Sequence, residues 1–198
     1  MLKKILLAAV IAFCMFHWWA NRPVHQPSGM LVKNKPLQEK VDDLNPFNFK
    51  NYSIIPLAKF NLKGRVLSKK RYWFGREAAL VPYDVAFGWG QMSNNMVLKD
   101  ISIRQSGRFY FWRSKELPIP EKQIIESSAN MHLMAANNDV KSLIKKLRRG
   151  NIVSLQGFLV KVDASDGWHW KSSMSRKDSG DGACELIWVE KMKIIEKG

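Results

Sequence analysis

Residues 139–162, DVKSLIKKLRRGNIVSLQGFLVKV, change from a helical to a strand pattern at a single glycine. Apolar side chains recur at helical spacing in the first part: Val140, Leu143, Ile144 and Leu147. This spacing places them on one stripe of a helix, and Gly150 is typical of a helix end. The residues that follow alternate apolar and polar side chains, which predicts a β-strand directly after the helix.

Four other segments have strand character, three before the helix and one after it. They are residues 60–74, 78–89, 100–113 and 183–195. In segment 100–113 the alternation divides the residues between two faces: Arg108, Tyr110 and Trp112 against Phe109, Phe111 and Arg113. Segment 121–137 fits either a short helix or an extended piece. The predicted order is therefore strand, strand, strand, helix, strand, strand.

This order resembles the OB-fold, a five-stranded Greek-key barrel with a helix between strands three and four. The resemblance covers roughly residues 58–196 and is one of topology and length, because the fold has no diagnostic sequence motif. Gly64 and Gly157 fall inside the first and fourth strands, where a small barrel must coil sharply. We expect a mainly β (α+β) chain with one OB-like barrel domain over residues 59–198. A generic α+β sandwich with the same element order is the alternative.

Residues 1–20 have the pattern of a secretory signal or membrane anchor. Two lysines precede an apolar run from Ile5 to Ala20. A cut after Ala20 would put the bulky Trp18 where a signal peptidase needs a small residue, so we expect an uncleaved transmembrane helix. The run spans about 24 Å at the helical rise. It predicts a single-pass protein of a bacterial-type inner membrane, with the C-terminal domain outside the cytoplasm and near anionic headgroups. A buried helix of a soluble protein is the alternative.

Residues 21–58 have the composition of a tether. Prolines recur through them, and neither a helical nor a strand period is maintained. We therefore expect them to join the anchor to the barrel domain.

Composition and charge limit the classes of function. The 198 residues are 46% hydrophobic and 25% charged, close to the globular average. Two cysteines exclude a disulfide-dense scaffold and a zinc site built from four cysteines. The formal net charge of +15 favours anionic partners.

The OB-fold resemblance implies a ligand face on strands two and three, flanked by the loops that join strands 1–2 and 4–5. The candidate residues combine cations, which track phosphates, with rings, which stack on bases or fill partner pockets. They are Lys70, Arg71, Arg108, Tyr110, Trp112, Trp168 and Trp170. Trp168 and Trp170 either pack on the barrel as a lid or offer a stacking surface to a ligand.

These residues support three hypotheses of function. The first is a non-catalytic binding module, anchored in the membrane, whose aromatic and basic face binds a protein partner. The alternative is single-stranded nucleic-acid binding by the same face. A distant third is a small hydrolase with Cys184 as nucleophile, His132 or His169 as base, and Asp84 or Asp181 as orienting group.

Acidic residues gather in one segment of this basic chain: Asp163, Asp166, Asp178, Asp181 and Glu185. Several carboxylates on a turning chain suit a hard cation. Asp followed by Gly is also ordinary turn chemistry. Because both explanations fit these acidic residues, we assign no metal ligands. We also assign no cofactor and no catalytic residue.

Overall fold

The computed structural model describes residues 2–41, 44–175 and 184–195. Strands dominate it, and the helices are short apart from the first. The strands are β1 (Leu37–Lys40), β2 (Phe47–Phe49), β3 (Tyr52–Arg71), β4 (Tyr83–Gly88), β5 (Ser102–Ser106), β6 (Phe109–Arg113), β7 (Ser128–Ala135), β8 (Ile152–Ala164), β9 (His169–Lys171) and β10 (Glu185–Ile195). The helices are α1 (Leu2–Asn21), α2 (Arg76–Leu80), α3 (Asn95–Leu98), α4 (Glu121–Glu126) and α5 (Asn138–Lys146), with a 3₁₀ turn, η1 (Gly90–Ser93).

The pairings of five strands return to their starting point. β3 pairs with β4, β4 with β7, β7 with β10, β10 with β8, and β8 again with β3. All these pairs are antiparallel except β7 with β10, which is parallel. Helix α5 connects β7 to β8. The chain therefore has an OB-like sheet with a helix between its third and fourth strands, which confirms the predicted resemblance at the level of the fold.

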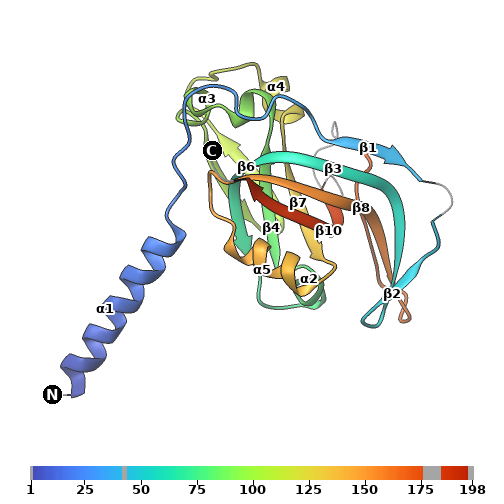
Figure 1. Cartoon of the computed structure of the whole chain (residues 1–198), viewed down its shortest axis with the longest axis horizontal. Helices are drawn as coiled ribbons and strands as arrows, with labels where there is room; N and C mark the ends of the chain where they lie inside the picture. The colour runs from blue at the N-terminus through green and yellow to red at the C-terminus, as the bar shows by residue number, and fades with distance from the viewer. Residues whose placement is uncertain (1, 42–43, 176–183, 196–198) are drawn as a thin grey trace.

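The inner side of this sheet holds the main core. Val85 and Phe87 of β4 pack there with Met131 and Leu133 of β7. Helix α5 adds its apolar stripe, and in Figure 1 it lies with α2 at one end of the sheet, while α3 and α4 lie at the other. Because side chains alternate along a strand, the other side of β4 and β7 is left for a second layer.

Segment 100–113 was predicted to be the third strand of this sheet. It forms instead a separate hairpin of β5 and β6. Its two turn residues, Gly107 and Arg108, have φ angles of 57° and 71°. Positive φ at both central residues defines the tight mirror-image turn that joins two short antiparallel strands. The third place in the main sheet is taken by β7, from the segment whose pattern was ambiguous.

Residues 21–58, predicted as a tether, contribute β1, β2 and the first part of β3 to the sheet. β1 pairs with β3, and β2 pairs with the first residues of β3. The preceding segment also contacts the domain, since Val24 donates to the Arg149 carbonyl at 2.7 Å and Val32 donates to Ser93 Oγ at 3.0 Å. The sheet therefore begins well before residue 59.

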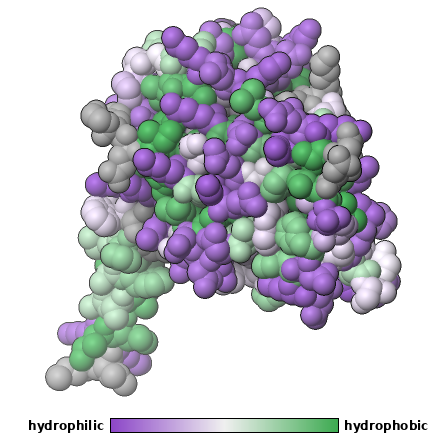
Figure 2. Space-filling view, turned by 45° about the vertical axis from the view of Figure 1, so that its right-hand side comes forward, coloured by the Kyte–Doolittle hydropathy of each residue, from purple (hydrophilic) through white to green (hydrophobic). Residues whose placement is uncertain are grey.

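Helix α1 extends away from the rest of the chain (Figure 1). Its apolar side chains are exposed, and Figure 2 shows hydrophobic residues gathered on it, whereas the visible face of the domain is mostly hydrophilic with scattered hydrophobic patches. Across the described residues, no helix combines the length and the apolar character needed to span a membrane. This finding corrects the predicted transmembrane anchor and single-pass location, and the expected contact with anionic headgroups depended on that anchor.

Candidate nucleic-acid interface

The β5–β6 hairpin covers the outer side of β4 and β7. Gln105 Nε2 donates to Asn130 Oδ1 at 2.6 Å, and Asn130 Nδ2 donates to the Arg108 carbonyl at 2.8 Å. Tyr110 and Trp112 pack with Ala86 in an apolar cluster between the two layers. The hairpin is thus held by apolar contacts near its base and by polar contacts near its turn.

The Arg108 side chain fastens the turn of the hairpin. Its Nη1 lies 2.6 Å from Oδ1 of Asp84, whose side chain is fully buried, and its Nη2 donates to the Val81 carbonyl at 3.0 Å. The guanidinium also lies 4.2 Å from the ring centre of Tyr72, whose hydroxyl accepts the Arg108 backbone N–H. A buried carboxylate requires such a partner, so Arg108 is held by structural contacts.

His132 completes a buried polar cluster. Its Nδ1 is 2.8 Å from Asp84 Oδ1, without the alignment of a hydrogen bond, and its ring lies 4.9 Å from that of Trp170. Of the residues named for a hydrolase, Asp84 and His132 thus lie together. Cys184 Sγ lies 3.6 Å from Nδ2 of Asn130, two residues before His132 on β7. His169 is exposed, and Asp181 lies outside the described residues.

The seven predicted ligand residues are divided among several places. Tyr110 and Trp112 face the sheet, and burial raises the pKa of Tyr110 to about 12. Trp168 packs against Tyr52, with ring centres 5.8 Å apart, while Trp170 packs on His132 near Arg108. Lys70 and Arg71 are exposed at the end of β3, where Arg71 stacks on Trp73 at 3.3 Å.

The acidic segment is only partly described. Asp166 forms an ion pair with Arg76, which lowers the Asp166 pKa, and Asp163 lies 2.7 Å from Lys161 Nζ. Asp178 and Asp181 are outside the described residues. In the part of the chain that the structure describes, no group of three or more His, Cys, Asp or Glu side chains could hold a metal ion.

The predicted ligand face of segment 100–113 held Arg108, Tyr110 and Trp112, but the residues of the other face are the ones that meet solvent. We call Arg104, Phe109, Phe111 and Arg113 the hairpin platform. The Phe109 and Phe111 ring centres are 6.3 Å apart, and the Arg104 guanidinium lies 5.8 Å from the Phe111 ring. Phe111 is 46% exposed. A ring this open beside a guanidinium is available for stacking.

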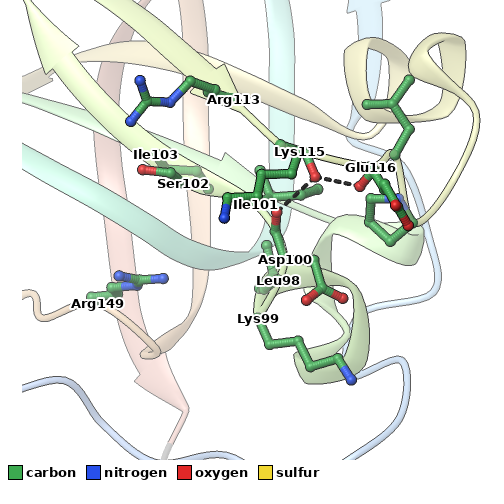
Figure 3. Close-up of a pocket in the computed structure, with 13 residues that line it drawn as sticks. Leu98, Lys99, Asp100, Ile101, Ser102, Ile103, Arg113, Lys115, Glu116 and Arg149 are labelled. Atoms are coloured by element: carbon green, nitrogen blue, oxygen red, sulfur yellow. Dashed lines mark hydrogen bonds between the residues drawn. The ribbon is translucent and has the colours of Figure 1, made fainter.

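The hairpin platform adjoins a cavity of about 1150 Å³, which we call the basic groove. Four cationic side chains line it: Lys99, Arg113, Lys115 and Arg149. Figure 3 shows that Lys99, Arg113 and Arg149 come from three segments, namely the end of α3, the end of β6 and the loop after α5. Asp100 and Glu116 are the acidic residues in its lining, so cations outnumber acids by four to two. Arg113 belongs to both features and joins the platform to the groove.

A second cavity of about 670 Å³ extends the positive surface past the groove. The two share Lys99 and Arg149, and the second also reaches Arg65. Burial, and then the charge of Arg149, lower the pKa of Arg65. The charge of Arg149 thus acts on Arg65 across this second cavity.

None of the platform and groove residues is among the seven predicted ligand residues. Alternation in segment 100–113 indicated two faces, but it carries no information on which face meets solvent. The one local signal was Gly107, whose place between two short alternating runs is typical of a hairpin turn. Lys99, Lys115 and Arg149 come together only through folding.

Comparisons with known proteins add little. No protein-family model and no curated protein matches this chain. Among solved structures, the mitochondrial single-stranded DNA-binding protein Rim1 of S. cerevisiae aligns with 71% of this chain and 96% of its own, at 10% identity. The TM-score is 0.26, which is too low to support an argument about this chain.

Proposed function

We propose that this protein binds single-stranded nucleic acid along the hairpin platform and the basic groove. The observation that supports this function best is the continuity of the two features: the exposed Phe111 ring, flanked by Arg104, leads through Arg113 into the four-cation groove. Single strands are bound by this combination, because bases stack on aromatic rings while cations follow the phosphates.

Charge and exposure favour this partner over the protein partner that the sequence first indicated. The net charge of +15 attracts a polyanion at long range, and the groove adds cations that acids do not balance. Single strands suit the platform better than duplexes do, since the bases of a duplex are already stacked inside it.

The test is a titration of a fluorescent oligothymidylate with the full chain, followed by anisotropy over a range of salt concentrations. We expect the log of the affinity to fall linearly with log salt, by about 0.7 for each phosphate neutralised. Phe111→Ala should weaken binding by about 1–3 kcal/mol. Arg113→Glu with Lys115→Glu should weaken binding and flatten the salt dependence.

Two control variants separate this surface from the rest of the chain. Phe74→Ala removes a ring that is 92% exposed between β3 and α2, and Lys63→Glu reverses an exposed charge on β3. Neither residue belongs to the platform or the groove, so Phe74→Ala should bind like the unmodified chain and Lys63→Glu should lose far less than the double variant. Absence of binding at low salt, or equal losses in controls and test variants, would overturn the proposed function.

A further inference from the structure

A separate cavity of about 710 Å³ lies between α2, the β2–β3 turn and the start of α5. Its lining includes the partly exposed apolar side chains of Phe49, Pro82, Ala135 and Ala136. Its volume falls in the range of small-molecule sites. Residues of the hairpin platform and the basic groove do not contribute to it.

Four cationic residues line the same cavity: Lys50, Arg71, Lys141 and Lys145. Lys141 and Lys145 are exposed and one turn apart on α5, so both reach the same side of the helix. Lys50 Nζ donates to the Ala79 carbonyl at 2.7 Å, which places its charge beside α2. Among the described residues that line the cavity there is no Asp or Glu.

The polar side chain of Asn137 in the lining is already engaged. Its Oδ1 accepts from the Val140 backbone N–H at 2.9 Å, and its Nδ2 lies 3.4 Å from the Glu190 carbonyl. A ligand body that needs many hydrogen bonds, such as a nucleobase, would therefore gain little from this side chain, whereas an apolar body matches the partly exposed Phe49, Ala135 and Ala136.

We propose that this cavity binds a small amphiphilic anion, with a carboxylate or phosphate head against Lys141 and Lys145 and an apolar tail over Phe49, Ala135 and Ala136. The apolar lining takes the tail out of water. Lys141 and Lys145 attract the head, and the described lining offers no Asp or Glu to a cationic ligand. This site is independent of nucleic-acid binding.

The experiment is calorimetric titration of the full chain with decanoate and, separately, with decyl phosphate. Acetate tests the head alone, and decanol tests the tail alone. We expect both amphiphilic anions to bind at least tenfold more tightly than either partial probe. Comparing decanoate with decyl phosphate shows which head the site prefers, while equal affinity for decanol and decanoate would overturn the proposal.

Variants locate the binding. Lys141→Glu and Lys145→Glu should each weaken decanoate binding about five- to tenfold, whereas Lys146→Glu, exposed on the same helix but outside the cavity lining, should change it less than twofold. Ala79→Trp fills the cavity from an exposed position and should abolish binding without affecting folding. Decanoate binding that none of these variants changes would place the ligand elsewhere, for example on the exposed apolar residues of α1, and would overturn the proposal. Oligonucleotide binding is measured in its own titration, so the nucleic-acid proposal and the cavity proposal can be refuted independently.

Discussion

Replacing Arg108 tests how the β5–β6 hairpin is held on the sheet. The Arg108 side chain is 15% exposed and that of Asp84 is fully buried, with 2.6 Å between Nη1 and Oδ1. Removing one partner of a buried pair leaves an uncompensated charge, which costs about 3–5 kcal/mol. The pair with Glu77, at 3.6 Å and half-exposed, adds little. We therefore expect Arg108→Ala to lower the free energy of unfolding by about 3–5 kcal/mol.

Two further variants separate the causes of this loss. Arg108 has a φ of 71°, a conformation that glycine adopts without strain. Arg108→Gly should therefore be about 1 kcal/mol more stable than Arg108→Ala, although both remove the side chain. Adding Asp84→Asn to Arg108→Ala should restore part of the lost stability, because it removes the unpaired buried charge.

Urea unfolding followed by tryptophan fluorescence measures these differences, provided that the denaturant slope stays constant. Hydrogen exchange at the amides of β5 and β6 shows whether the hairpin opens locally before the sheet unfolds. A loss below about 1 kcal/mol for Arg108→Ala, with unchanged exchange in the hairpin, would refute the reasoning.

Two other predictions concern the sheet. Burial lowers the pKa of Lys69, which donates to the Lys145 carbonyl, to about 8. In the unfolded chain the pKa of Lys69 stays near 10.4. Between pH 8 and about 10.4 the unfolded chain therefore binds more protons than the folded chain. Stability should therefore rise from pH 8 towards 10, by about 1 kcal/mol after allowance for solvent screening, and Lys69→Met should lack this rise in urea unfolding at pH 7.5 and 9.5. At Gly157, an added Cβ would lie 1.9 Å from the Trp188 carbonyl oxygen. Gly157→Ala should thus cost more than about 3 kcal/mol, and more than Gly64→Ala, which meets only side-chain atoms; comparable thermal stability of the two variants would contradict this.

Helix α5 and strand β8 were predictable because each has a strong local period. The stripe of α5 and the alternation of β8 are visible in residues 139–162 without knowledge of any partner. The third strand was predicted wrongly because the regular alternation of residues 100–113 belongs to a hairpin. β7 has no exposed polar face to mark it, since its outward residues Asn130 and His132 are buried, Asn130 against Gln105 of that hairpin.

At the candidate interface, local sequence patterns did not determine which side of the hairpin is exposed. Alternation predicted that Tyr110 and Phe111 point in opposite directions, and they do. Which of them meets solvent depends on the side of the hairpin that packs on β4 and β7, and those strands are distant in sequence.

The local sequence determined which segments are helical or extended, and their order, since the period of a helix or a strand is set by neighbouring residues. The exposed side of the hairpin, and the meeting of Lys99 with Arg149 in one groove, were decided by folding alone. The physical reason is that burial depends on surfaces that only the folded chain brings together.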